Sequence, residues 1–269
     1  MKINCSNIRD LPKPKYLATT TQIPLNQPGL NYPIESFKLA SNYDDATLSE
    51  WALHIRRHYT RDDQLAPISA IQPIEEYLRE LIIPDAERTR TGDFGEIVVA
   101  DIIQHNEGYI VPRYKQFDRD DKNMSGQGVD VVAYKLKSPL TPQTDDELLL
   151  IEVKSSRTES RVWPSLNKAK KEYRRNLARR ALSVNNIRRR ATMLNDLITA
   201  NEMRRFQDQN AVDFKETNGY AIVVSIDDMQ YHIDHFRTKI KENDNERVYV
   251  VHRTQLGKLI DAIYERCTK

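Results

Sequence analysis

The chain has 269 residues, 30% of them charged and 39% apolar, and its formal net charge is only +2. This length allows one large domain or a domain with a sizeable extension. The sequence shows no apolar run as long as a membrane span and no secretory signal, so we expect a cytoplasmic protein that does not contact a membrane. Cys5 and Cys267 lie at opposite ends, which excludes a disulfide framework and a cysteine-type zinc motif.

The first third of the chain carries no catalytic motif. Residues 11–34 contain five prolines. Proline fixes φ and removes a backbone donor, so this segment is predicted to be extended or irregular. We interpret residues 1–87 as a mostly helical or irregular N-terminal extension that packs either on a catalytic domain formed by residues 88–269 or on a partner.

Within this extension, apolar residues recur at helical spacing over 47–59 and 72–82, which predicts two helices. Pro84 should end the second of them. His54 and His58 are spaced four apart on the first helix, but their neighbours suggest a surface helix. We therefore expect no metal site at this pair.

A third helix is predicted over 93–106. Asp93 follows Gly92 and resembles an N-cap, and Glu96 lies three residues later, as in a capping box. Glu96 could act only as this capping partner. Alternatively, it could face a metal pocket as a further ligand or an orienting group.

Runs of β-branched and apolar residues then predict three strands, over 109–116, 128–136 and 147–155. Asp130 lies at the start of the second strand, and Glu152 and Lys154 lie at the end of the third. Residues two apart on a strand point to the same face, so Glu152 and Lys154 should point the same way. Pairing of the two strands would bring Asp130 beside them.

Two carboxylates and an ammonium at strand ends suit the hydrolysis of a phosphodiester. Mg²⁺ prefers oxygen ligands, which Asp130 and Glu152 would supply, and Mn²⁺ would substitute. Lys154 would orient the attacking water and stabilise the charge of the transition state. The alternative is a plain salt bridge between Glu152 and Lys154. Burial at the end of an apolar strand argues against it, as do the second acid and the glycines Gly126 and Gly128, which would let a ligand approach the backbone.

A long helical region is predicted over 160–206, followed by strands over 220–226 and 247–252 and a closing helix over 254–266. Residues 154–205 contain fifteen basic and four acidic residues. Such an excess beside a metal site suits a nucleic-acid backbone. The residues that we expect to contact it are Lys168, Lys171, Arg174 and Arg175. A solvated helix face, or a surface that binds an acidic partner, would explain the same charges.

The predicted core order is α-β-β-β-α-β, with Glu96 on the first helix, Asp130 on the second strand and Glu152-Val153-Lys154 on the third. In this the chain resembles the PD-(D/E)XK nuclease superfamily, although Val129 stands where the nominal motif has proline. The resemblance implies a restriction-endonuclease-like α/β fold with a mixed central sheet flanked by helices. It also implies a magnesium-dependent deoxyribonuclease whose site contains Glu96, Asp130, Glu152 and Lys154.

A narrower resemblance lies in four short blocks: Gly-Asp-Phe-Gly-Glu, Gly-Tyr-Ile-Val-Pro-Arg-Tyr-Lys, Asn-Met-Ser-Gly-Gln-Gly-Val-Asp and Ile-Glu-Val-Lys-Ser-Ser. These are similar to the HamA family, the nuclease subunits of the Hachiman antiphage system. This resemblance implies a helicase partner, HamB, and degradation of DNA in infected cells. Two alternatives remain open: a site-specific restriction-type endonuclease, and a DNA- or partner-binding subunit whose nuclease site is held inactive.

Overall fold

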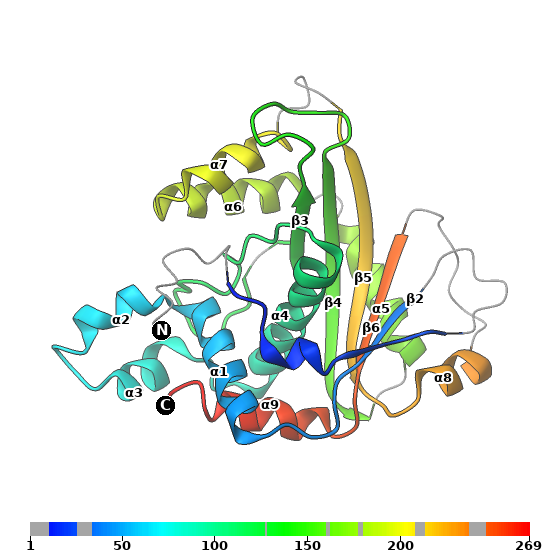
Figure 1. The fold of residues 1–269 in the computed structure, drawn as a ribbon, viewed down its shortest axis with the longest axis horizontal. Coiled ribbons are helices and arrows are strands. Elements are labelled where there is room, and N and C mark those ends of the chain that lie inside the picture. Colours follow the sequence, from blue (N-terminus) through cyan, green and yellow to red (C-terminus); the bar gives the residue numbers. More distant parts are fainter. Residues whose placement is uncertain are drawn as a thin grey trace.

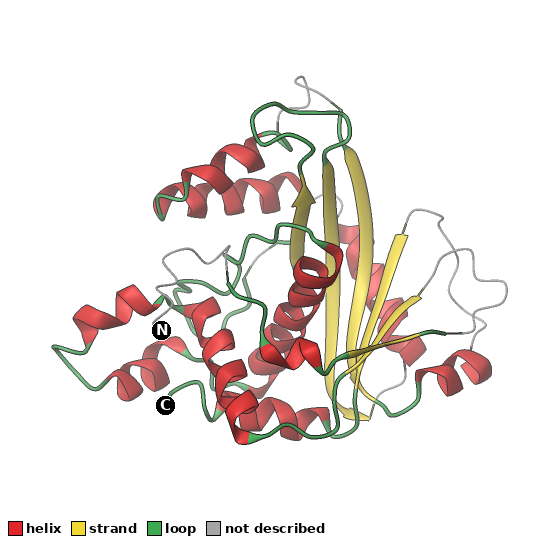
Figure 2. Ribbon diagram, in the orientation of Figure 1, coloured by secondary structure: helices red, strands yellow, loops and turns green. Residues whose placement is uncertain are grey.

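A central sheet with helices on both faces forms the core of the computed structural model (Figures 1 and 2). The structure describes residues 11–25, 34–126, 128–159, 162–176, 180–207, 213–236 and 246–269. Within them the sheet has six strands in the order β1-β2-β6-β5-β4-β3. Their bounds are β1 Thr21–Ile23, β2 Ile34–Lys38, β3 Val131–Lys135, β4 Glu147–Glu159, β5 Lys215–Ser225 and β6 Glu246–His252.

The sheet is mixed. The four inner strands β2, β6, β5 and β4 run parallel to one another, and the two edge strands β1 and β3 are antiparallel to their neighbours. Parallel strands are normally covered on both faces by helices, and their sequences are then apolar on both faces. The central part of β5, from Tyr220 to Val224, is fully buried in this way.

One face of the sheet is covered by α1 (Asp45–Tyr59), α4 (Glu87–Glu107) and α9 (Leu256–Tyr264). The residues of β4 that point into this layer are Leu149, Ile151 and Val153. They share one hydrophobic cluster with Trp51 of α1 and Ile97 of α4.

The opposite face is covered by α5 (Val162–Asn176), α6 (Arg180–Met193) and α7 (Leu197–Arg204). Here β4 contributes Leu148 and Leu150. Glu152 and Lys154 continue the same alternation, so the sequence prediction that they share a face agrees with the register. The remaining described elements are the 3₁₀ turn Lys15–Ala18, α2 Asp62–Ile68, α3 Ile74–Tyr77, the π-helical turn Leu78–Ile82 and α8 Met229–Phe236.

The predicted mixed α/β class is confirmed, with most of the predicted helices and strands in place. The long helical region is divided into α5, α6 and α7, and the sequence did not predict β1, β2, α2 or α8. None of the described helices is long and apolar enough to cross a membrane. Part of the expected extension joins the main sheet, because β2 pairs with β6 over Ile34–Lys38. A separate extension over residues 1–87 stays a prediction.

The predicted strand over 109–116 differs in the structure, where only an isolated bridge joins Ile110 to Tyr134. Pro112 has no N–H with which to extend this ladder. In addition, three cations of the irregular segment that follows are drawn to a row of acids on α4. The pairs are Asp93–Arg119, Glu96–Lys115 and Asp101–Arg113.

The predicted helix start at Asp93 is wrong, because α4 begins at Glu87 and Asp93 lies inside it. The side chain of Asn123 accepts hydrogen bonds from the backbone N–H groups of Asp85 and Ala86 at 3.1 and 2.9 Å, just before the helix. This partner is 37 residues away from Ala86, so local sequence patterns could not reveal it. The capping-box interpretation of Glu96 is therefore also wrong.

Gly95 allows α4 to approach β4 closely. A Cβ atom at this position would lie 1.8 Å from the Oγ atom and 3.0 Å from the Cβ atom of Ser155. The next residue on the helix is Glu96, so this close approach sets how near Glu96 lies to the sheet.

We expect Gly95→Ala to lower the free energy of unfolding by about 1–3 kcal/mol, because the added methyl group overpacks the contact with Ser155. Gly92→Ala on the same helix is the control, since its Cβ would meet nothing within 4 Å. That control should stabilise the protein by roughly 0.5–1 kcal/mol through helix propensity. Urea unfolding of both variants tests this, and equal effects would show that the close contact does not matter.

Candidate active site

Three of the four predicted site residues meet where β3 and β4 begin to pair. Asp130 immediately precedes β3, and Val131 pairs with Ile151 of β4, so Asp130 lies beside Glu152. The Oδ2 atom of Asp130 accepts a hydrogen bond of 2.7 Å from the backbone N–H of Val153. This contact fixes the carboxylate of Asp130 against β4.

Lys154 lies on the same side of β4 as Glu152, and its Nζ atom is 2.7 Å from Glu152 Oε1. The salt bridge that the sequence allowed is thus present. The same Nζ atom is 2.8 Å from Oε2 of Glu172, a residue of α5 that sequence reasoning missed. Lys154 therefore joins the strand to the helix that follows it.

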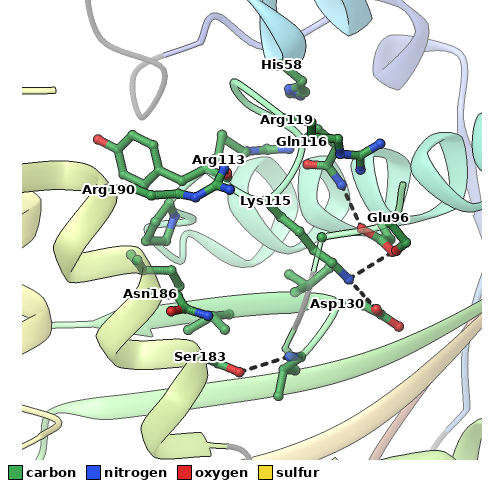
Figure 3. A pocket seen from close by; sticks show the side chains of 18 of the residues that line it. His58, Glu96, Arg113, Lys115, Gln116, Arg119, Asp130, Ser183, Asn186 and Arg190 are labelled. Carbon is green, nitrogen blue, oxygen red and sulfur yellow. Dashed lines mark hydrogen bonds and ion pairs between the residues drawn. The ribbon is translucent and has the colours of Figure 1, made fainter. Parts of the chain in front are cut away.

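A second lysine, Lys115, completes the cluster from the irregular segment after α4. Its Nζ atom lies 3.0 Å from Glu96 Oε1 and donates a further hydrogen bond to Asp130 Oδ1 (Figure 3). Gln116 donates to the other oxygen of Glu96 at 2.7 Å. Glu96 thus faces the cluster, as the functional interpretation expected. The sequence gave no spacing signal for Lys115, because it lies on no regular element.

Burial and neighbouring charges shift the pKa values of the three acids in this cluster. Burial raises the pKa of Glu96 to about 8, although the charge of Lys115 opposes the shift. Burial and the charge of Asp130 raise the pKa of Glu152 to about 7. Burial acts in the same direction on Asp130, but Lys115 and Lys154 outweigh it and hold its pKa below the usual value. Asp130 is therefore the carboxylate that keeps its charge at neutral pH.

The lysines keep their charge as well. Burial alone would lower the pKa of Lys115, but the charges of Asp130 and Glu96 outweigh burial and raise it. Lys154 behaves in the same way, with its pKa raised by Asp130 and Glu152. Two ammonium groups thus face three carboxylates.

Gly128 has a different role from the one predicted. Its φ of +107° is a backbone conformation that favours glycine, and a Cβ atom there would lie 2.7 Å from Ser183 Oγ. The same hydroxyl accepts a hydrogen bond of 2.9 Å from the N–H of Val129 (Figure 3). The glycine therefore lets α6 pack against the segment that carries Asp130, rather than admitting a ligand.

The predicted backbone contacts on α5 are only partly described. Lys168 and Lys171 are exposed on this helix, while the side chains of Arg174 and Arg175 lie outside the described residues. Lys170, between the two exposed lysines, is buried and lies 2.7 Å from Glu246. The basic excess is thus not one continuous exposed face.

His54 and His58 do not lie on a surface helix, because both side chains are buried in α1. The Nε2 atom of His54 lies 3.0 Å from Asp101, whose carboxylate also pairs with Arg113 at 2.8 Å. His54, His58 and Asp101 could in principle surround an ion. The guanidinium of Arg113 already supplies the positive charge at this carboxylate, which disfavours a metal there.

The chemistry of the main cluster fits a hard divalent cation. Lys115 links Glu96 to Asp130, Asp130 lies beside Glu152, and carboxylate oxygens are the ligands that Mg²⁺ and Mn²⁺ accept. The three acids would have to draw closer around an ion, because they do not form a group whose ligand atoms all lie within 4.8 Å of one another. The ammonium of Lys115 lies between Glu96 and Asp130, which shows that a positive charge is stabilised at this point.

These features define a mixed α/β protein with a cluster of acids and lysines where the start of β3 pairs with the middle of β4, a strand that continues past its predicted end to Glu159. A family model for HamA matches residues 15–267, and the chain belongs to the HamA family. This membership supports a place in Hachiman antiphage defence. No curated protein matches the chain.

In EDTA, we expect the free energy of unfolding to fall as pH rises from about 5 to 8. The folded protein retains protons on Glu96 and Glu152 that the unfolded chain releases near the usual pKa of 4.5. This contribution is full below that value and is lost as pH rises through the folded values of about 7 and 8. Asp130 does not contribute to this decline, because its pKa is lowered and it exchanges its proton below this pH range.

Urea unfolding at pH 5, 6.5 and 8 measures this decline. Glu96→Gln should make the decline smaller, because the amide cannot release a proton, and the part due to Glu152 should remain. Glu76→Gln, at an exposed position of α3, is the control and should keep the slope of the original protein. A decline that Glu96→Gln leaves intact would remove Glu96 as its cause.

Proposed function

We propose that the protein is a metal-dependent deoxyribonuclease that hydrolyses phosphodiester bonds. The observation that carries this proposal is the chain of contacts that links Glu96, Asp130, Glu152 and Lys154 through Lys115 and the backbone of β4. Carboxylates that share a site with a lysine, on elements far apart in sequence, are costly to bury without a role. Perturbed protonation in such a cluster is typical of catalytic sites.

The fold supports membership of the PD-(D/E)XK superfamily. A helix with the first glutamate, α4, precedes β3 and β4 with their Asp130 and Glu152-Val153-Lys154, and α5 and β5 follow. One departure from the expected order of elements is the segment over 109–116, which does not form the expected strand. We place the nuclease domain in residues 88–269, with β2 of the preceding segment completing its sheet.

In the mechanism that we propose, Asp130 and Glu152 hold Mg²⁺, or Mn²⁺ in its place, and Glu96 completes the site. The bound cation would supply Lewis acidity and neutralise charge on the scissile phosphate. Lys154 holds the attacking water through its ammonium and stabilises the negative charge that develops around phosphorus. The N–H of Val153 keeps Asp130 in place during the reaction.

Membership of the HamA family supports the wider setting that we propose. The protein would be the effector subunit of a bacterial defence complex and would act in the cytoplasm beside a HamB-like helicase. The helicase would open or move along DNA, and this subunit would degrade it. A small net charge of +2 suits a subunit whose delivery to DNA is shared with a partner.

A second candidate is a subunit whose nuclease site is held inactive until a partner binds. Lys154 is engaged by Glu172 as well as by Glu152, and Lys115 is engaged by two of the catalytic acids. These ion pairs must rearrange before both lysines can serve a phosphate. Contact of a partner with α5 would move Glu172 and so release Lys154.

We expect the purified chain with Mg²⁺ to degrade supercoiled and linear DNA, with no cleavage in EDTA. Asp130→Ala should reduce the rate by about 10²–10³-fold, because loss of one electrostatic group commonly costs that much. A gel assay separates a smear, as for indiscriminate degradation, from the discrete bands of a restriction-type endonuclease. Wild-type-like cleavage by Asp130→Ala would contradict the site assignment. Cleavage that occurs only after the helicase is added would favour the second candidate, a subunit whose nuclease site is held inactive until a partner binds.

Metal binding gives a test that does not depend on activity. We expect Mn²⁺ to bind in a calorimetric titration, and Asp130→Asn or Glu152→Gln to weaken that binding at least tenfold. Asp145→Asn is the control, because Asp145 is exposed and pairs with Lys215 away from the cluster. Equal binding by all four proteins would show that the cluster does not hold the metal.

A further inference from the structure

A cavity of about 370 Å³ opens directly beside the catalytic cluster. Glu96, Lys115 and Asp130 form part of its lining, and the rest comes from α4 and the segment after it, from β3, from α6 and from the end of α1 (Figure 3). Ligand pockets commonly span roughly 300–1,000 Å³. The cavity is therefore large enough for one nucleotide and far too small for a base-paired duplex.

The lining away from the catalytic acids is basic. It includes Arg113, Arg119, Arg189 and Arg190, and the acids opposing them there, Asp120 and Asp121, are exposed. Asn186 of α6 faces the same space (Figure 3). None of these residues belongs to the set on α5 that the sequence predicted as the nucleic-acid contact.

Several buried polar atoms of this lining lack a hydrogen-bond partner. They are the Nη1 atom of Arg113, the Nε atom of Arg119 and both ring nitrogens of His58. The side chains concerned are between 0 and 6% exposed. Buried polar groups are nearly always satisfied, so each of these atoms calls for a ligand or water. Each of them has less than 1 Å² of accessible surface, so a ligand in the cavity reaches them only when the lining moves.

The other atoms of these side chains are held in place. Arg119 binds Asp93 through both terminal nitrogens at 2.8 and 2.6 Å. Arg113 binds Gln104 at 3.0 and 2.7 Å and Asp101 at 2.8 Å. These contacts fix the two side chains, so this wall of the cavity is rigid, and a rigid site lowers the entropy cost of binding.

We propose that this cavity receives one unpaired nucleotide next to the scissile phosphate, with its phosphate facing the cations that line the cavity. Single-stranded DNA is then the preferred substrate. A paired base would have to leave its stack to enter, and that costs least when the strand is already single. Recognition of unpaired nucleotides by arginine planes and a basic groove is general among single-strand binders. This inference rests on the proposed nuclease function and specifies its substrate.

Binding measured apart from cleavage tests this inference. In the full chain with Glu152→Gln, which blocks hydrolysis, fluorescence anisotropy at one fixed salt concentration gives Kd for three probes. The salt must be constant because phosphate contacts are strongly salt-dependent. The probes are a labelled 15-nucleotide single strand, the blunt duplex of the same sequence, and dTMP as a competitor.

Asn186→Glu places a negative charge in the cavity without altering Arg113, Arg119 or the catalytic acids. The matched control is Asn185→Glu, since Asn185 is the exposed neighbour on α6 and does not line the cavity. Thermal melting of both variants checks that they fold equally well. We expect the single strand to bind at least tenfold more tightly than the duplex. Asn186→Glu should weaken single-strand binding at least tenfold, and Asn185→Glu less than twofold.

Three results would overturn the inference: equal or tighter binding of the duplex, equal effects of the two glutamate variants, or dTMP that binds as tightly as the strand. The last would make the cavity a site for a free nucleotide. The outcome is separate from that of the nuclease proposal, because binding is measured without hydrolysis. If the wild-type protein never cleaves DNA but binds single strands in the predicted way, the proposed nuclease function is contradicted. The proposed role of the cavity in binding a single strand is then still supported.

Discussion

The ammonium of Lys115 lies between the carboxylates of Glu96 and Asp130, and the local structure depends on this contact. Glu96 belongs to a helix that covers the sheet, whereas Asp130 belongs to the segment that starts its edge strand. A charge on Asp130 opposes the ionisation of Glu96, and the ammonium of Lys115 between them stabilises the charged form of both acids. The ion pair therefore joins the two layers and keeps the acids available for chemistry.

The same principle extends along α4, which carries acids on the side that faces the irregular segment. Each acid pairs with a cation of that segment: Asp93–Arg119, Glu96–Lys115 and Asp101–Arg113. The segment therefore runs antiparallel to α4, since the first acid pairs with the last cation. These pairs hold the segment to the helix instead of to the sheet. They also leave the cavity between the segment and α6, where the unused N–H groups of two arginines are buried.

This arrangement changes where a nucleic acid would be expected to bind. The basic excess in residues 154–205 suggested α5, yet several of its charges are engaged internally, as Lys170 is with Glu246 and Arg180 with Glu216. The cations beside the catalytic acids come instead mainly from the segment after α4 and from α6. A count of charges along the sequence gives the number of basic side chains, whereas the fold decides which of those side chains a ligand can reach.

The sequence by itself determined the strands around Asp130 and Glu152-Val153-Lys154, because alternation along a strand is a local property that fixes which side chains share a face. It also indicated that Glu96 could face the same site. The start of α4, the two lysine bridges and the cavity were decided only by the tertiary structure. Asn123 acts on a helix end 37 residues away, and Lys115 reaches Glu96 and Asp130 from an irregular segment. Such contacts join residues distant in sequence, so no local periodicity encodes them.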